Sequence, residues 1–204
     1  DVTYCLETLP KVSRTFAPTI KMLPNVLYIP VAVAYLLCRI ADTIEDEASL
    51  SKERKIFLLD LYISIFKKMN SESFELFLEE TKDITEHSED VILLHNFPKV
   101  FNVFNSFSGE VKKHISFWVV EMSEGMKKYT QSDKKSTLQF LKSMNDLDEY
   151  MYYVAGTVGY LLTSLFAHFS KKITPPVKKK LESFAESFGK GLQMVNIIRD
   201  MTTD

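Results

Sequence analysis

The sequence predicts an all-α protein, and three observations support this fold class. Glycine is scarce, with 6 among 204 residues. No run of alternating apolar and polar residues is bounded by tight turns, as β-hairpins require. Several long stretches repeat apolar residues every three or four positions, the spacing that gives a helix one apolar face. The length suits a single domain, 1–204, or a domain with a piece missing.

The first half of the chain divides into helices at its prolines and serines. Four prolines lie in residues 1–30, so this stretch should form short helices and turns. A long helix is expected over residues 30–47, because proline is tolerated at a helix start. Ser51 and the apolar spacing that follows it predict a helix beyond residue 51. The polar stretch 70–90 should hold one short helix and a loop.

The middle of the chain continues this pattern. Residues 90–107 are apolar at helical spacing, with a break expected near Pro98. Ser108 is a suitable cap for a helix over residues 109–129. The polar residues 130–136 are expected to form a loop.

The last part should be helical with one turn. Residues 137–169 are expected to form two helical segments. Residues 171–176 should form a turn, because Pro175 and Pro176 cannot lie inside a helix. From Val177 onward we expect a helix that reaches the end of the chain.

The composition excludes several classes of protein. Apolar residues make up 46% and charged residues 25%, an ordinary globular balance. The net charge of −2 indicates no nucleic-acid partner, which would call for a basic patch. Two cysteines, Cys5 and Cys38, are too few for a disulfide framework, so we expect a reducing, cytoplasmic location. The four histidines show no ligand spacing, so no zinc site is expected.

No targeting or membrane-spanning segment is apparent. The first residue is Asp rather than Met, so we expect the native start to be absent. The longest apolar run, residues 26–38, contains Pro30 and falls short of the ~20 residues that a membrane span needs. We therefore expect a buried core helix, while peripheral contact with a membrane stays open.

Three acids cluster near the end of the expected long helix. Asp42, Glu45 and Asp46 share one helix face, and Arg39 lies one turn before them. Like charges at this spacing repel each other. Carboxylate oxygens suit hard cations, and Mg²⁺ binds through one or two carboxylates together with substrate phosphates. The cluster therefore indicates a magnesium site.

A second polar stripe follows the last helix. Gln193, Asn196, Asp200 and Asp204 succeed one another at three- and four-residue intervals, with Arg199 beside them. Each acid pair alone is equally compatible with a solvated helix end. Two such pairs facing each other would clamp a diphosphate through bridging Mg²⁺ ions, which would neutralise the charge on a departing diphosphate.

A third pattern combines tyrosine, valine and glycine. Tyr150, Val154 and Val158 lie on one helical stripe. Gly156 and Gly159 each cost roughly 1 kcal/mol relative to alanine inside a helix, so a ligand or another helix is expected to approach closely there. The stripe suits plain core or a slot for isoprenoid tails. Tyr150 would then hydrogen-bond a leaving group or move a proton.

Four blocks of the chain resemble the squalene/phytoene synthase family. They are residues 12–16, 38–46, 150–159 and 193–200, in the family's order. The resemblance implies the all-α isoprenoid synthase fold, with helices around a central cavity and the two aspartate motifs on opposite walls. It also implies that a C-terminal part, roughly a quarter of the family's usual length, is missing here.

The resemblance further implies a role for each matching residue. Tyr150 matches a tyrosine assigned to the first half-reaction, and the motif aspartates match catalytic metal ligands. Thr203 stands where the family usually has an acid, which lowers the local negative charge. The implied metal ligands are Asp42, Glu45, Asp46, Asp200 and Asp204. The implied substrate-binding residues are Ser13, Arg14, Phe16, Arg39, Val154, Val158, Gln193, Asn196 and Arg199.

The activity implied by the resemblance is a head-to-head condensation. A Mg²⁺-dependent transferase would join two prenyl diphosphates, such as farnesyl diphosphate, through a cyclopropyl diphosphate to squalene, with NADPH as the reductant. No Gly-rich nucleotide fingerprint is present, so NADPH rests on the resemblance alone. The alternatives are a dehydrosqualene or phytoene synthase, a non-catalytic assembly or scaffold factor, and a terpene cyclase or head-to-tail elongase. The oligomeric state stays open.

Overall fold

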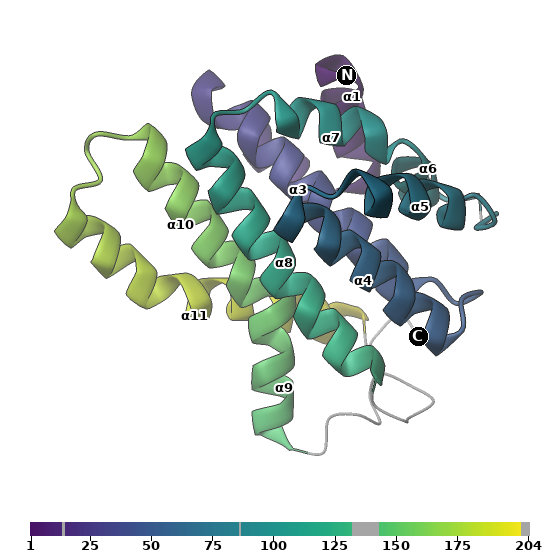
Figure 1. Cartoon of the computed structure of the whole chain (residues 1–204). Coiled ribbons are helices and arrows are strands. Elements are labelled where there is room, and N and C mark those ends of the chain that lie inside the picture. Colours follow the sequence, from purple (N-terminus) through teal and green to yellow (C-terminus); the bar gives the residue numbers. More distant parts are fainter. Residues whose placement is uncertain (14, 86, 132–142, 201–204) are drawn as a thin grey trace.

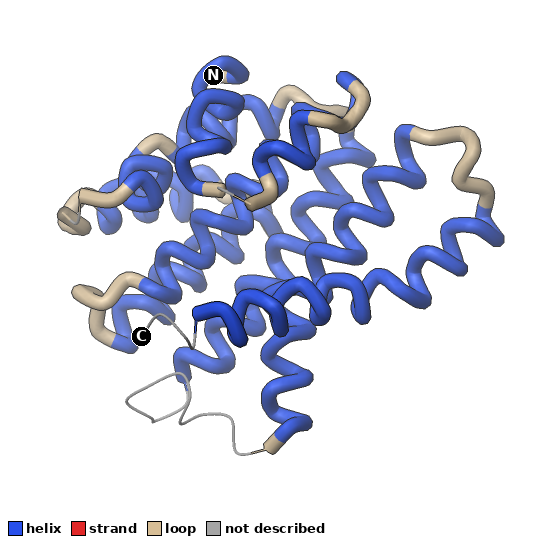
Figure 2. The backbone as a smooth tube through the Cα atoms, turned by 180° about the vertical axis from the view of Figure 1, so that it is seen from behind, coloured by secondary structure: helices blue, strands red, loops and turns tan. Residues whose placement is uncertain are grey.

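Helices account for the regular structure of the computed structural model, which describes residues 1–13, 15–85, 87–131 and 143–200, the side chain of Asp200 excepted. Within these ranges no strand occurs, so the all-α prediction is confirmed (Figures 1 and 2). The elements are α1 (Val2–Val12), α2 (Ala17–Lys21), α3 (Asn25–Asp46), α4 (Lys52–Lys68), α5 (Ser71–Thr81), α6 (Glu89–His95), α7 (Phe97–Asn105), α8 (Gly109–Gln131), α9 (Met144–Met151), η2 (Tyr152–Gly156), α10 (Thr157–Phe169) and α11 (Pro175–Asp200).

Helix α3 forms the centre of the bundle. It contacts α1, α2, α4, α6, α7, α8 and α10, and α4 and α8 lie side by side across it (Figure 1). Leu36, Leu37, Ile40 and Ile44 are fully buried. By length and composition α3 could cross a membrane, but 72% of its apolar window is buried inside the protein. This extent of burial agrees with the prediction from the sequence that the apolar run forms a buried core helix.

The start of α3 differs from the sequence prediction. The expected start at Pro30 is wrong, because the helix begins at Asn25. The carbonyl of Pro24 accepts from the amides of Leu27 and Tyr28 at 2.8 and 2.9 Å, which closes the first turn. Pro30 lies in the second turn and removes one backbone hydrogen bond. Its ring is buried in the core, and this burial offsets the loss.

Two helix starts follow the sequence prediction, at Ser51 and Ser108, and a third serine cap, Ser88, was not predicted. The hydroxyls of Ser51 and Ser108 accept from the amides three residues ahead, at 3.2 and 3.5 Å. The hydroxyl of Ser88 accepts in the same way from the amide of Val91, at 3.1 Å. The helix expected over residues 90–107 breaks at Asn96, because Pro98 is accommodated in the first turn of α7.

Two boundaries later in the chain correct the sequence prediction. Helix α8 continues to Gln131, so Thr130 is helical and not part of a loop. Thr130 donates its hydroxyl to the carbonyl of Met126 at 2.9 Å, which fits the last turn of a helix. Residues 132–142 lie outside the described part. Pro175 and Pro176 form the first turn of α11 and are not part of the turn before it. Proline is tolerated there because the backbone amides of the first helical turn have no acceptor within the helix.

A π-helical turn separates α9 from α10. The amide of Thr157 donates to the carbonyl of Tyr152, five residues back. The result is one helical rod from Met144 to Phe169 with a wider turn in its middle. Such turns occur often at functional sites. The two helical segments expected in this region are confirmed from residue 144 onward.

Glycines allow α10 and η2 to lie directly against α11. A Cβ atom on Gly159 would stand 2.0 Å from the carbonyl oxygen of Ala185, and one on Gly189 would stand 2.1 Å from that of Ala155. The close helix approach expected at Gly159 is therefore confirmed. Lys190 adds a polar link, since its ammonium lies 2.6 Å from carboxylates of both Asp148 and Glu186.

Substituting Gly159 by alanine should destabilise the protein. The added methyl group must displace the α11 backbone, and overpacking of this kind costs about 1–3 kcal/mol. That cost is expected to exceed the gain in helix propensity, about 1 kcal/mol. Urea unfolding of the full-length gene product would measure the change.

The matched control is Gly191→Ala, also in α11. A Cβ atom there meets nothing within 4 Å, so the substitution should raise the free energy of unfolding by about 0.5–1 kcal/mol. Equal effects of the two substitutions would contradict the close approach of α10 and α11.

Candidate active site at the end of the central helix

One face of α3 carries a line of polar side chains. Tyr35, Arg39, Asp42 and Asp46 follow at intervals of four, three and four residues, which keeps them on one side of the helix. The side chains of Arg39 and Asp42 are 32% and 28% exposed. Glu45 is half-buried, and Asp46 is exposed. The apolar body of α3 therefore ends in a charged mouth.

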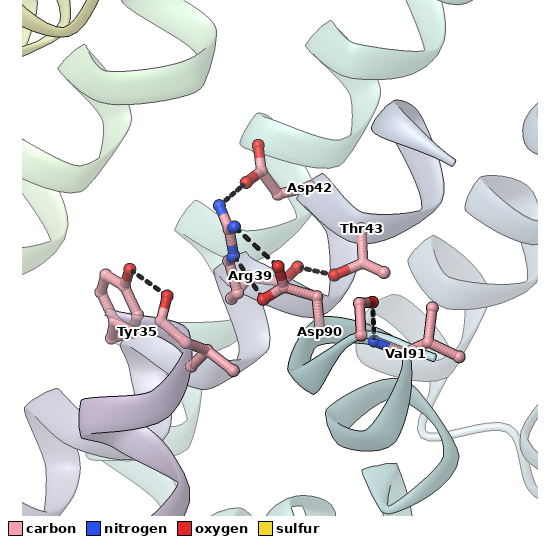
Figure 3. Close-up of polar contacts among 8 residues, drawn as sticks. Tyr35, Arg39, Asp42, Thr43, Asp90 and Val91 are labelled. Carbon is pink, nitrogen blue, oxygen red and sulfur yellow. Dashed lines mark hydrogen bonds and ion pairs between the residues drawn. The ribbon is translucent and has the colours of Figure 1, made fainter. Parts of the chain in front are cut away.

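The Arg39 guanidinium is held by two carboxylates. Its Nε and Nη2 donate to the two oxygens of Asp90, each at 2.9 Å, and its Nη1 donates to Oδ2 of Asp42 at 2.5 Å (Figure 3). Asp90 comes from α6, 51 residues further along the chain. The sequence reasoning missed Asp90, because an acid in the first turn of a capped helix usually needs no further explanation.

The acids of α3 are electrostatically strained. Burial, reinforced by Asp46, raises the pKa of Asp42 to about 7, although Arg39 opposes this shift. Burial and then its two acidic neighbours raise the pKa of Glu45 to about 8, with Lys55 opposing. The pKa of Asp46 is also raised, chiefly because surrounding protein atoms limit the hydration of its carboxylate, although the residue as a whole is exposed. Ionising all three together is therefore costly unless a cation joins them.

The donor set suits a divalent cation shared with a substrate. Among the described residues, no group of three His, Cys, Asp or Glu side chains is arranged to hold a metal by itself. Mg²⁺ seldom uses such an all-protein cage, and it usually binds one or two carboxylates, waters and substrate phosphates. Oxygen-only donors with raised pKa values fit this type of site.

Tyr150 of α9 lies within electrostatic range of these acids. Burial is the main reason that its pKa lies well above the ordinary value, and the carboxylates of Glu45, Asp46 and Asp42 raise it further. Its ring packs edge-on against Tyr129, with centroids 5.2 Å apart. The Tyr129 hydroxyl in turn contacts Glu149 at 3.1 Å. Elements far apart in the sequence thus bring Tyr150 to the charged end of α3.

The segment after α1 is fastened to the same face of α3. The Tyr35 hydroxyl donates to the carbonyl of Val12 at 3.5 Å, and its ring lies 6.2 Å from that of Phe16. Ser13 is 4% exposed, and its hydroxyl accepts from the amide of Phe16 at 3.2 Å. Ser13 therefore closes the turn that presents Phe16. Arg14 lies outside the described residues.

The expected tail-binding residues lie on the π turn and just beyond it. Val154 and Val158 are half-buried, and Val154 packs against the main core. The wider turn places Tyr153 against Gly125 of α8, where an added Cβ would stand 2.1 Å from the Tyr153 ring. The apolar stripe is therefore continuous with the core on one side.

Two members of the polar stripe of α11 are partly enclosed. Gln193 and Asn196 are half-buried, whereas the apolar Val195 and Ile198 are 63% and 58% exposed. Arg199 is exposed.

The meeting of the two acid motifs stays a prediction. The side chain of Asp200 and all of Asp204 lie outside the described residues. In both views the carboxyl end of α11 points toward the side of the molecule where α3 ends (Figures 1 and 2). The contacts that fix α11, described above, run to η2, α10 and α9.

Known proteins resemble this chain in sequence and structure. The family model for squalene/phytoene synthase matches residues 9–204. "Squalene synthase clz20" of Cochliobolus lunatus is 34% identical over 205 residues, covering 100% of this chain and 46% of that protein. "Squalene synthase BSS" of Botryococcus braunii is 32% identical over 204 residues, covering 100% and 41%.

A solved structure, the complex of TcSQS with the ligand E5700, superimposes with a TM-score of 0.75 at 27% identity, covering 98% of this chain and 53% of that one. The match confirms the isoprenoid synthase fold. The chain spans less than half the length of the two relatives named above.

The family model covers nearly the whole chain, and it includes both acid motifs and the Tyr150 segment. Because this family model matches residues 9–204, well over half of the chain, the chain belongs to the squalene/phytoene synthase family.

Proposed function

We propose that the protein containing this chain is a Mg²⁺-dependent prenyltransferase that condenses two molecules of farnesyl diphosphate head to head, through a cyclopropyl diphosphate, to squalene. One observation carries the proposal: a protonated tyrosine, Tyr150, lies within electrostatic reach of three strained carboxylates at the mouth of an apolar helix. The squalene synthase names of the aligned relatives agree with it.

The residues that would hold the metal are the acids of the two motifs. Asp42, Glu45 and Asp46 form the first set, and Asp200 and Asp204 would form the second. Bound Mg²⁺ supplies positive charge that neutralises the diphosphate and makes it a better leaving group. The raised pKa values of Asp42 and Glu45 support this assignment, because a cation would offset the burial and the repulsion between acids that cause them.

The polar residues around these acids would bind and orient the substrates. Arg39, Arg14 and Arg199 would contact diphosphate oxygens, for which guanidinium groups are well suited. Gln193 and Asn196 would line the cavity. Tyr150 carries its proton at neutral pH, as an ordinary tyrosine does, and would serve as a hydrogen-bond donor to the leaving diphosphate. Phe16, Val154 and Val158 would exclude water around the isoprenoid tails.

The remaining features of the proposal follow from the substrate class. Residues 1–204 would belong to one isoprenoid synthase domain. NADPH would reduce the cyclopropyl diphosphate to squalene. The protein would act in the cytoplasm and touch a membrane surface peripherally, because prenyl chains partition into lipid.

Radiolabelled farnesyl diphosphate tests the function directly. The full-length gene product should consume it when Mg²⁺ is present, and mass analysis should find squalene when NADPH is added. A dehydrosqualene or phytoene synthase would give its product without NADPH. Absence of any turnover by a folded sample would refute the enzymatic proposal.

Asp42→Asn should abolish condensation while leaving the helices intact. Removing the carboxylate charge from the metal-binding set is expected to lower kcat by at least about 10²-fold. Circular dichroism would check the fold. The control is Asp60→Asn, which removes an acid that pairs with Lys127 between α4 and α8 at 2.5 Å. Full turnover in Asp42→Asn would count heavily against the proposed site.

Removal of divalent ions should stop the reaction reversibly. Treatment with EDTA is expected to eliminate turnover, and Mg²⁺ should restore it. Mg²⁺ with inorganic diphosphate should also raise the unfolding temperature of the wild type, because a ligand that binds the folded state stabilises it. The same addition should leave Asp42→Asn nearly unchanged. Undiminished activity in EDTA would contradict a metal-dependent mechanism.

Tyr150→Phe should slow the first condensation more than it weakens substrate binding. Loss of a positioned proton donor is expected to lower kcat by about 10²-fold with little change in KM. Single-turnover formation of the cyclopropyl diphosphate would measure this. Tyr152→Phe is the matched control, because the Tyr152 hydroxyl contacts Glu121 at 3.3 Å and should not affect the rate. An unchanged rate in Tyr150→Phe would remove this residue from the chemistry.

A further inference from the structure

Helix α6 brings the carboxylate of Asp90 to the Nε–Nη2 edge of the Arg39 guanidinium (Figure 3). The Ser88 cap begins the helix, and its buried residues Val91, Leu93 and Leu94 fix it to the core. Asp90 lies in the first turn between the cap and these anchors. Its side chain is 30% exposed, similar to that of Arg39. The position of Asp90 is therefore set by the packing of α6 in the core, including its contacts with α3.

The two carboxylates contact different numbers of nitrogen atoms on the Arg39 guanidinium. Asp90 takes Nε and Nη2 in a two-point contact, and Asp42 receives only Nη1 (Figure 3). A two-point contact between arginine and a carboxylate fixes the plane of the guanidinium as well as its distance. Oδ1 of Asp42 is thus left out of the pair with Arg39.

We propose that Asp90 is a positioning residue of the active site: it holds Arg39 so that this arginine pairs with one oxygen of Asp42 and leaves the other for a divalent cation. The inference rests on the proposed function, since it concerns the metal-binding role of Asp42. Without Asp90, the same guanidinium is released to offer Asp42 a two-point contact. Arg39 then competes with the cation for both carboxylate oxygens.

The charge of Asp90 acts in the same direction as its geometry. Replacing it by a neutral side chain leaves the positive charge of Arg39 balanced only by the acids that bind the cation. At distances of a few ångströms and partial burial, a unit charge changes the binding of a divalent cation strongly. Both effects weaken cation binding when Asp90 is neutral.

The test uses Asp90→Asn in the full-length gene product, with two readouts. One is the Mg²⁺ concentration that gives half-maximal turnover. The other is equilibrium binding of Mn²⁺ in the presence of inorganic diphosphate, followed by electron paramagnetic resonance, which requires no turnover. We expect both the half-saturation concentration and the Kd for Mn²⁺ to rise about tenfold, an order-of-magnitude figure for the loss of one nearby charge.

The matched control is Glu89→Gln, the neighbouring acid in the same turn of α6. Glu89 pairs with Lys11 of α1 at 3.7 Å and has no contact with Arg39 among the described pairs. Its replacement should leave both metal readouts unchanged. The unfolding temperatures of Asp90→Asn and Glu89→Gln should also be compared. A lower unfolding temperature would show a loss of stability, which lowers the fraction of active protein, whereas a change in Kd for Mn²⁺ shows a change in metal affinity.

A double substitution tests whether Asp90 acts through Arg39. In an Arg39→Gln background, Asp90→Asn should change the Kd for Mn²⁺ much less than it does alone, because the arginine that it releases is gone. If Asp90→Asn does not fold, Asp90→Glu at lower temperature replaces it. The longer side chain misplaces the carboxylate, and a smaller shift in the same direction is expected.

Three outcomes overturn the inference. The first is an unchanged Kd for Mn²⁺ in Asp90→Asn, or in Asp90→Glu where that variant is used. The second is an equal effect of Asp90→Asn with and without Arg39. The third is a lower active fraction without a change in metal affinity. A wild-type protein that neither turns over nor binds Mn²⁺ with diphosphate refutes the proposed function itself, which distinguishes that failure from failure of the inference.

Discussion

The structure depends on the cost of placing three carboxylates at the end of a buried helix. Asp42 and Glu45 are half-buried, and their pKa values are raised to about 7 and 8 by burial and mutual repulsion. Arg39 and Lys55 relieve only part of this cost. A fold that keeps such a cluster at the mouth of its central helix retains an unfavourable feature, which is typical of functional sites. The interpretation of the chain as an enzyme follows from this imbalance.

The helices that surround the cluster are fixed by contacts of a different kind. Gly159 and Gly189 let α10 and α11 meet backbone to backbone, and Lys190 ties α11 to α9. These contacts orient the polar stripe of α11 and the rod that carries Tyr150. Tyr35 performs a similar task for the segment that ends at Phe16. Rigid packing on three sides thus supports a site whose own groups repel each other.

Sequence patterns predicted much of this arrangement because the signals are local. Helical spacing predicted the helices, Ser51 and Ser108 predicted two of their starts, and the spacing of Asp42, Glu45 and Asp46 predicted the acid face. Two of the boundaries that failed lie at prolines, Pro30 and Pro175, and a third is the end of α8 at Gln131. Proline is tolerated near helix starts, so sequence alone does not fix how far a helix extends beyond it.

The contacts that sequence reasoning missed are non-local. Asp90 reaches Arg39 across 51 residues, and Tyr35 reaches Val12 across 23. Nothing in the spacing of these residues indicates the pairing, because it arises from how α6 and α1 pack on α3. Sequence reasoning also missed the π turn at Tyr152–Gly156. This feature is local, but its sequence differs little from that of an ordinary helix.

A crystal structure of the full-length gene product with Mg²⁺ and a non-cleavable prenyl diphosphate tests the central claim most directly. The account predicts divalent ions between the diphosphate and the carboxylates of Asp42 and Asp46 on one wall, and of Asp200 and Asp204 on the other. Acid motifs that face separate regions of solvent, with the diphosphate bound elsewhere, would contradict it.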